Sequence, residues 1–251
     1  MAAGLRSAIV VWDFDFSLIP VNSDTHIPRA LAPSPPLEAL LATRGVPWTE
    51  LMGRVLDHLH ASAVPPSAIS AAAAAMPFDP SIHEAIRSAH GKGVRQFILS
   101  DANTLYIGAF LEAHALTRLF TAVHTNPATL PAAGDGPVRL APAHSGQSPH
   151  GCPMCPPNLC KGGVLSAWQQ GGELSSATRV FYVGDGMGDA CPALRLGQDD
   201  VVLARAGFPL ARALGEGGAL AASLRARLVQ WGTGEELRDA LQAALGEGCS
   251  H

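Results

Sequence analysis

Charge, basic residues and long apolar runs are all scarce in this sequence. Only 15% of its 251 residues are charged, whereas 47% are apolar, so the chain can bury a core and is not of the disordered class. Lys and Arg number 17 against 21 Asp and Glu, and the net charge is −4, which lacks the basic footprint of a nucleic-acid-binding protein. No run of about 18 apolar residues occurs, so we expect no membrane span.

Cysteine is also scarce, and its count is odd. Three of the five cysteines lie within residues 152–160, which is not the pattern of a secreted domain held by disulfides. The apolar stretch near the N-terminus is short and runs into acids, so it is typical of a first strand rather than of a signal peptide. We expect a reducing compartment, with the cytoplasm as the default.

Apolar patterns predict alternating strands and helices over most of the chain. Strands are expected at residues 7–12, 94–100, 120–125, 179–185 and 201–204, with helices between the later strands and amphipathic helices to the C-terminus. This alternation favours the α/β class, as a three-layer, Rossmann-like parallel sheet covered on both faces.

Residues 25–76 differ in composition, being rich in Ala, Leu and Pro with helical periodicity. We expect them to form a small helical cap inserted after the first strand, while residues 1–24 and 77–251 form the core. The alanine run within residues 67–75 favours a helix, and low-complexity filler is the alternative.

Two aspartates, Asp13 and Asp15, directly follow the first predicted strand. An open α/β sheet places its site at the carboxyl ends of the strands. Two carboxylates spaced i, i+2 repel each other and raise one pKa unless a cation is present. One can then serve as nucleophile or metal ligand and the other as general acid; a pair of turn or capping residues is the alternative.

Three further segments carry polar residues after a strand or at a helix start. Ser100 ends a strand, where its hydroxyl can bind an anion or cap a helix. Lys161 opens a helix against the helix dipole, which favours a bound phosphate; a solvated surface lysine is the alternative. Asp185 and Asp189 lie among three glycines after a strand, as in a tight metal-binding loop, with an Asp/Gly turn as the alternative.

The order of these motifs is more specific than any one of them. D-x-D-x-[ST], a strand-terminal Ser, a Lys and G-D-G-x-x-D resemble the four motifs of the haloacid dehalogenase superfamily of phosphatases, over residues 9 to about 200. The segments NSDT (22–25), LSDANTLYI (99–107), HTNP (124–127), HGCPMCPPNLCKGG (150–163) and YVGDGMGDACP (182–192) resemble the phosphoethanolamine/phosphocholine phosphatase family. Relatives of that family include plant pyrophosphatase-like and thiamine-monophosphate-phosphatase-like proteins and a pyridoxal-phosphate phosphatase. Phe16 departs from the family, in which a polar residue is common at this non-catalytic position.

The resemblance implies an enzyme, a phosphatase, with a covalent intermediate. Asp13 would attack phosphorus and become an aspartyl phosphate. Asp15 would protonate the leaving oxygen and then deprotonate the hydrolytic water. Ser100 and Lys161 would bind phosphoryl oxygens.

The resemblance also implies one Mg²⁺ cofactor. Asp13, the backbone carbonyl of Asp15 and Asp185 would hold the metal, with Asp189 supporting from beside it. At an effective dielectric constant of about 20, one charge at about 4 Å contributes roughly 4 kcal/mol. A metal and a lysine together would therefore supply much of the stabilisation that phosphoryl transfer needs.

A Cys/His cluster precedes Lys161. His150, Cys152, Cys155 and Cys160 have residue types and spacing compatible with a structural Zn²⁺. C-x-x-C also permits a redox pair, and plain packing is the third alternative. The low apolar content of residues 126–160 favours a metal that holds the segment together.

The expected partner is a small phosphorylated metabolite, without nucleic acid or membrane. Asp24 and Asp101 are acids expected near the pocket that neither the metal nor the phosphate needs, and they favour a substrate with a cationic tail; a role as turn or capping residues is the alternative, especially for Asp101, which precedes a helix. Phosphoethanolamine and phosphocholine fit this requirement; pyridoxal phosphate, thiamine monophosphate and pyrophosphate are the alternatives. A phosphomutase and a non-catalytic metabolite-binding protein are the alternatives in other classes.

Overall fold

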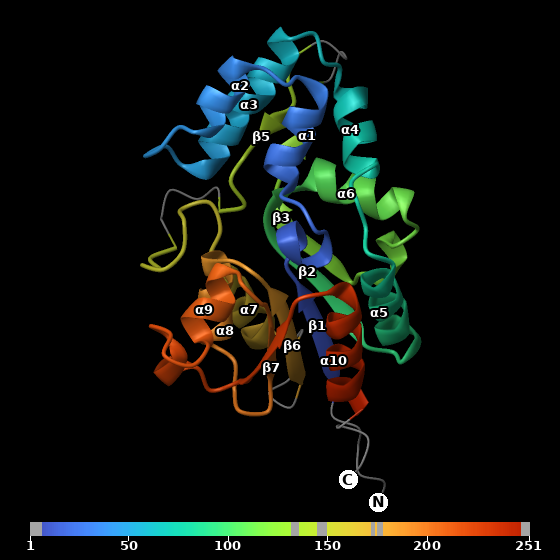
Figure 1. Ribbon diagram of the computed structural model, residues 1–251, viewed down its shortest axis with the longest axis vertical. Helices are drawn as coiled ribbons and strands as arrows, with labels where there is room; N and C mark the ends of the chain where they lie inside the picture. Colours follow the sequence, from blue (N-terminus) through green and yellow to red (C-terminus); the bar gives the residue numbers. More distant parts are fainter. Residues whose placement is uncertain (1–6, 132–135, 145–149, 172–173, 175–177, 247–251) are drawn as a thin grey trace, which may run out of the picture.

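The protein is described by a computed structural model that covers residues 7–131, 136–144, 150–171, 174 and 178–246. Within these residues, one parallel sheet of six strands runs through the centre of the core, in the order β3-β2-β1-β6-β7-β8 (Figure 1). Its strands are β1 (Ala8–Trp12), β2 (Arg95–Asn103), β3 (Ala122–Asn126), β6 (Arg179–Gly184), β7 (Val201–Arg205) and β8 (Arg227–Trp231). The predicted α/β class with a parallel sheet is confirmed.

Helices cover both faces of the sheet, because β1 is apolar on both sides. Val10 and Trp12 belong to a core on one face, and Ile9 and Val11 to a second core on the other. The first core is covered by α5 (Pro80–Gly91), α6 (Thr104–Ala113) and α10 (Gly234–Gly246). The second is covered by α7 (Lys161–Gln170), α8 (Ala190–Ala193) and α9 (Pro209–Leu214), which lie on the opposite side of the sheet in Figure 1.

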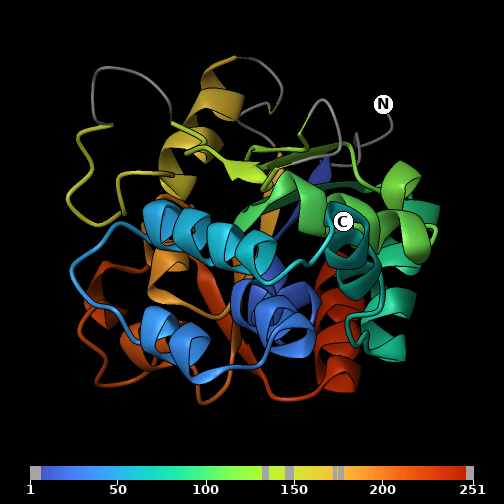
Figure 2. The ribbon, with the colours of Figure 1, turned by 90° about the horizontal axis from the view of Figure 1, so that it is seen from above.

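Between β1 and α5, the chain forms helices that lie across the carboxyl edge of the sheet (Figure 2). They are α1 (Ser23–Leu31), α2 (Pro35–Leu41), α3 (Trp48–Ala61) and α4 (Pro66–Ala74). The alanine run is therefore helical in α4. Leu37, Leu51 and Val55 form a small core of their own, whereas Ile27 and Ile69 join the main core. The cap is thus packed against the sheet domain, and the division at residues 25 and 76 stays a prediction.

The remaining elements are short connections. They are the π-helical turn η1 (Phe14–Leu18), the 3₁₀ turns η2 (Thr117–Leu119), η3 (Met187–Asp189) and η4 (Ala221–Ser223), and the antiparallel pair β4 (Ala128–Thr129) and β5 (Arg139–Leu140). The pair β4–β5 lies in the excursion at 126–160, part of which falls outside the described residues. No described helix is both long and apolar enough to span a membrane.

The prediction of helices alone after the strand at 201–204 is wrong. Arg227–Trp231 forms β8, paired in parallel with β7. β8 lies at the edge of the sheet, and four of its five residues are exposed or only partly buried. The period-2 apolar signal of a half-buried strand is weak in such a segment.

Candidate active site

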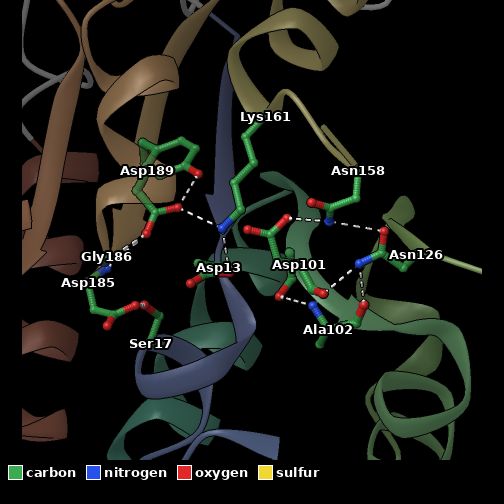
Figure 3. A network of polar contacts seen from close by, with 12 residues as sticks. Asp13, Ser17, Asp101, Ala102, Asn126, Asn158, Lys161, Asp185, Gly186 and Asp189 are labelled. Atoms are coloured by element: carbon green, nitrogen blue, oxygen red, sulfur yellow. Dashed lines mark hydrogen bonds and ion pairs between the residues drawn. The ribbon is translucent and has the colours of Figure 1, made fainter. Parts of the chain in front are cut away.

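Asp13 lies at the carboxyl end of the central strand. Its backbone N–H donates to the carbonyl of Val183, 2.9 Å away, which ties the end of β1 to the end of β6. Its carboxylate is buried, and Oδ1 accepts a hydrogen bond from Lys161 Nζ at 2.8 Å (Figure 3). Strand order reverses beside β1, which is where open α/β sheets bind ligands.

Lys161 links two carboxylates in the interior. It is the first residue of α7, its side chain is only 4% exposed, and Nζ also donates to Asp189 Oδ1 at 2.8 Å. Burial alone lowers the pKa of the Lys161 ammonium, but Asp13 and Asp189 outweigh burial and raise that pKa above its usual value. Lys161 is therefore a fixed cation, and the surface-lysine alternative does not apply.

Asp189 accepts hydrogen bonds on both of its oxygens. Oδ1 accepts from the Tyr182 hydroxyl at 2.7 Å as well as from Lys161, and Oδ2 accepts from the N–H groups of Asp185 and Gly186, both at 3.1 Å. A Cβ on Gly184 would lie 2.6 Å from Asp189 Cγ, so only glycine fits there. Asp189 thus fixes the loop that carries Asp185 and has little capacity left for another ligand.

The turn after Asp13 brings Asp15 into the same site. Phe16 adopts a left-handed conformation, with φ of 54°, which is uncommon for a residue other than glycine and is often found at functional sites. Its N–H donates to Val21 O, and its carbonyl accepts from Arg205 Nη1 at 2.6 Å. Asp15 Oδ1 accepts from the N–H of Ser23 at 2.9 Å, and burial raises the pKa of Asp15 to about 6.

The end of β2 supplies a further part of the site. Ser100 is buried, and its Oγ accepts a long hydrogen bond, 3.3 Å, from the N–H of Ala102. Asp101 follows it, and its Oδ1 accepts from Asn158 Nδ2 at 3.3 Å (Figure 3). Burial raises the pKa of Asp101. Ser100 and Asp101 line the same cavity as Asp13 and Lys161.

The helical cap also contributes side chains to the site. Asp24, in the first turn of α1, is 3% exposed and accepts from Trp48 Nε1 at 2.7 Å on Oδ2. Burial, followed by the neighbouring Asp15, raises the pKa of Asp24 to about 8. Asp24 and Trp48 line a cavity of about 240 Å³ together with Asp13 and Lys161. This volume is below the roughly 300–1,000 Å³ of pockets for drug-sized ligands, so the site suits a small molecule.

The cavity carries a large excess of acid. Among the described residues that line it, the ionisable ones are a single lysine and six aspartates: Asp13, Asp15, Asp24, Asp101, Asp185 and Asp189. Burial, together with Asp189 and Asp185, raises the pKa of Asp13, which Lys161 opposes. Burial and Asp189 raise the pKa of Asp185 to about 7. Six carboxyl groups beside one ammonium repel one another unless some of them hold protons or a divalent cation binds between them.

The donor set fits a hard divalent cation. Carboxylate oxygens of Asp13, Asp185 and Asp189 all lie within 4.8 Å of one another in a buried group. Oxygen ligands of this kind suit Mg²⁺, which usually takes one or two carboxylates and keeps water or substrate oxygens as its other ligands. Since Asp189 is already occupied by four donors, Asp13 and Asp185 are the two with free capacity.

The predicted Cys/His cluster is brought together with one change of member. The sulfur atoms of Cys152, Cys155, Cys160 and Cys191, hereafter the cysteine cluster, all lie within 4.8 Å of one another. His150 does not share in it: Nε2 bonds the carbonyl of Pro156 at 2.8 Å, and Nδ1 accepts from the N–H of Cys152. Both ring nitrogens of His150 are thereby used, and Cys191 occupies the fourth place.

Sequence reasoning missed several residues at the candidate site and in the cysteine cluster. Trp48, Asn158 and Cys191 reach their places through tertiary packing and carry no local motif for it. Tyr182 is different, because it lies within a continuous run of buried residues in β6 and is itself fully buried. A buried tyrosine hydroxyl needs a partner, and the acids three and seven residues further along the chain, Asp185 and Asp189, are the sequence signal of where that partner lies.

Comparison with known proteins identifies relatives of this chain. The "Putative Phosphatase" family profile matches residues 8–245. Inorganic pyrophosphatase 2 of Arabidopsis thaliana is 32% identical over 244 residues, which cover 96% of this chain and 85% of that protein. Phosphoethanolamine/phosphocholine phosphatase of Homo sapiens is 35% identical over 251 residues, covering 97% and 91%. A phosphoserine phosphatase structure with a phospho-aspartyl intermediate analogue aligns with a TM-score of 0.59 at 13% identity, over 95% of this chain and 99% of that one, which shows a shared fold.

Proposed function

The chain belongs to the "Putative Phosphatase" family and is a phosphatase of the haloacid dehalogenase fold, and from that premise we propose a Mg²⁺-dependent hydrolase of a small phosphate monoester. The favoured substrates are phosphoethanolamine and phosphocholine. The observation that carries the proposal is the contact of Asp13 with Lys161, 2.8 Å apart, in the wall of a cavity that also holds Asp24 and Trp48.

Asp13 is the proposed nucleophile. Its carboxylate attacks phosphorus, a bond from Asp13 oxygen to phosphorus forms, and the bond to the leaving oxygen breaks. Lys161 favours the ionised form of Asp13 and lies where it can also bind a phosphoryl oxygen. Ser100, whose hydroxyl is buried in the cavity wall, is the proposed second phosphoryl ligand.

Asp15 is the proposed acid and base. It gives its proton to the leaving oxygen and later takes one from the water that hydrolyses the aspartyl phosphate. A general acid works best with a pKa near the operating pH, and burial raises the pKa of Asp15 to about 6. The hydrogen bond from Ser23 N–H to Oδ1 fixes one oxygen and leaves the other for proton transfer.

Asp13, Asp185 and the carbonyl of Asp15 would hold Mg²⁺, which when bound neutralises charge on the phosphoryl oxygens. Asp189 would act on the metal site indirectly, since its oxygens accept hydrogen bonds from Lys161 and from the N–H groups of Asp185 and Gly186. Its proposed role is to position Lys161 and Asp185.

Asp24, Asp101 and Trp48 are the proposed binding groups for a cationic tail. The indole face of Trp48 can take an ammonium by cation–π attraction, and two buried acids beside it supply charge. Because a nearby cation favours ionised carboxylate, binding of the tail would release the proton of Asp24, whose pKa lies near 8. KM for a cationic ester should therefore fall as pH rises toward that value.

Pyrophosphate is the second candidate, since a relative in Arabidopsis thaliana is named inorganic pyrophosphatase 2. Its second phosphate group would occupy the part of the cavity nearest Asp24 and Asp101. Among the described residues that line the cavity, Lys161 is the lone basic one, and it serves the first phosphate. The charge of the cavity thus favours the cationic ester.

A substrate panel with Mg²⁺ tests the proposal. We expect the highest kcat/KM for phosphoethanolamine or phosphocholine, ahead of pyridoxal phosphate, thiamine monophosphate, pyrophosphate and the neutral-tailed p-nitrophenyl phosphate. Asp24→Asn and Asp101→Asn should raise KM for the cationic esters more than for p-nitrophenyl phosphate. Equal losses on both substrate types would remove the charge argument, and a preference for pyrophosphate would establish the second candidate.

A further inference from the structure

The cysteine cluster lies outside the cavity and takes no part in the chemistry proposed above. Three of its members come from the loop before α7, and Cys191 comes from the first turn of α8. Cys160 and Cys191 are buried, and Cys152 and Cys155 are partly buried. All four are free thiols in the part of the chain that the structure describes.

The sulfur–sulfur distances match a tetrahedral metal site. With metal–sulfur bonds of about 2.3 Å, the edge of a tetrahedron of four sulfurs is about 3.8 Å. The distance from Cys191 Sγ to Cys152 Sγ is 3.6 Å, and that to Cys160 Sγ is 3.9 Å. A disulfide needs about 2.05 Å, and one sulfur lying at nearly equal distances from two partners is not the arrangement of a single bonded pair.

Backbone amides also support the sulfurs. The N–H of Gly163 donates to Cys160 Sγ at 3.2 Å, and the backbone of Met154 bonds the Cys152 sulfur. Hydrogen bonds to metal-bound ligands of this kind orient the ligands and tune the metal. The sequence-based alternative with His150 is disfavoured, because its two ring nitrogens are bonded to Pro156 and Cys152 backbone atoms.

We propose that the cysteine cluster binds one structural Zn²⁺, separate from the Mg²⁺ site. Each of the four thiols gives up its proton to solvent and binds as a thiolate. Four protein ligands leave no open coordination position, which is the rule for structural rather than catalytic zinc.

The proposed zinc holds two catalytic segments together. Cys160 directly precedes Lys161, and Cys191 lies two residues after Asp189, so the ligands adjoin both ends of the 2.8 Å ion pair between Lys161 and Asp189. Close approach of the two segments needs Gly162, since a Cβ there would lie 2.5 Å from Cys191 Sγ. Removal of the metal should therefore loosen Lys161 as well as the loop.

Elemental analysis of the full chain, purified under reducing conditions without added metal, tests the proposal. We expect about one zinc per chain by the stoichiometry of a four-thiolate site. Reconstitution with Co²⁺ should give the thiolate-to-cobalt charge-transfer band and the visible bands of tetrahedral cobalt. Both readouts use wild-type protein and do not depend on phosphatase activity.

Variants identify the ligands. Cys191→Ser should lose the zinc and lower Tm, whereas His150→Ala should keep it. Cys249→Ser is the matched control: it removes the fifth cysteine, which lies outside the described residues, and should keep the zinc. Zinc-free wild-type protein with normal Tm, or a disulfide between cluster members under reducing purification, would overturn the proposal. So would zinc that survives Cys191→Ser but is lost in His150→Ala.

Discussion

Replacement of Lys161 by methionine is the most direct test of the electrostatics of this site. Methionine keeps an unbranched side chain of similar length, so the main change is the loss of one buried positive charge. Lys161 Nζ is 2.8 Å from both Asp13 Oδ1 and Asp189 Oδ1, and no more than 8% of any of the three side chains is exposed. Solvent therefore screens these contacts weakly, and the loss should be large.

The size of the effect follows from the charge and its distance. One charge at about 4 Å and an effective dielectric constant of about 20 contributes roughly 4 kcal/mol. Each 1.36 kcal/mol is tenfold in rate, so full loss of that term lowers kcat/KM about a thousandfold. A bound divalent cation offsets part of it, and we expect a fall of about 10²–10³-fold in the presence of Mg²⁺.

The pH dependence gives a second readout, with a definite sign. Burial raises the pKa of Asp13 and Lys161 lowers it, so removing Lys161 raises that pKa further. The nucleophile must be ionised, and the acid limb of kcat/KM should therefore move to higher pH in Lys161→Met. A purely structural defect would lower the amplitude without moving the limb.

Lys92 provides the matched control, because it is the other lysine in the sequence and is exposed at the end of α5. Lys92→Met removes the same charge from the surface and should leave kcat/KM, its pH profile and Tm unchanged. The assay is phosphate release from a fixed ester over a range of pH, with Tm measured on each variant. Lys161→Met with near-normal kcat/KM and an unshifted acid limb would refute the reasoning.

Three further predictions follow from the same cavity. Asp13→Asn should abolish turnover and the phosphoenzyme while far-ultraviolet circular dichroism stays native; more than about a hundredth of wild-type activity would contradict covalent catalysis. Chelation should abolish activity, and added Mg²⁺ should restore it. Asp185→Ala should raise the Mg²⁺ concentration that activity requires. Full activity after chelation would contradict the proposed dependence on Mg²⁺. Native Asp24 keeps its proton up to about pH 8, whereas the unfolded chain loses it near pH 4, so the carboxyl destabilises the native state between these pH values. Without metal, Asp24→Asn should therefore raise Tm at about pH 7.5 and not near pH 4. An equal change in Tm at both pH values would contradict a buried neutral carboxyl.

The edge of the sheet that carries the candidate site was predictable from sequence, because local patterns fix it. A short apolar run that ends in acids must place those acids at the carboxyl edge of a parallel sheet, and this reasoning located Asp13 and Asp185. The helix start at Lys161 was equally local. Parallel pairing of β1 with both β2 and β6 then brings together the strand ends that carry Asp13, Ser100 and Asp185.

The cap and the edge strand were less predictable, for different physical reasons. Trp48 enters the cavity wall only because α3 packs beside α1, where its indole donates to Asp24, and helical periodicity does not give that packing. β8 was missed because an edge strand with partly exposed residues has little apolar alternation.

The fourth member of the cysteine cluster is not the residue that sequence spacing predicted. His150 is close in sequence and has the right chemistry for zinc, yet its ring is used to fold the loop on itself. Cys191 is 31 residues beyond Cys160 and is brought to it by the packing of α7 on α8 at Gly162. The same packing sets the distance between Lys161 and Asp189, so the segment that completes the cysteine cluster is also the segment that orients Lys161. A change at Gly162, such as Gly162→Ala, should therefore disturb the cysteine cluster and the ion pair together, although neither contains that residue.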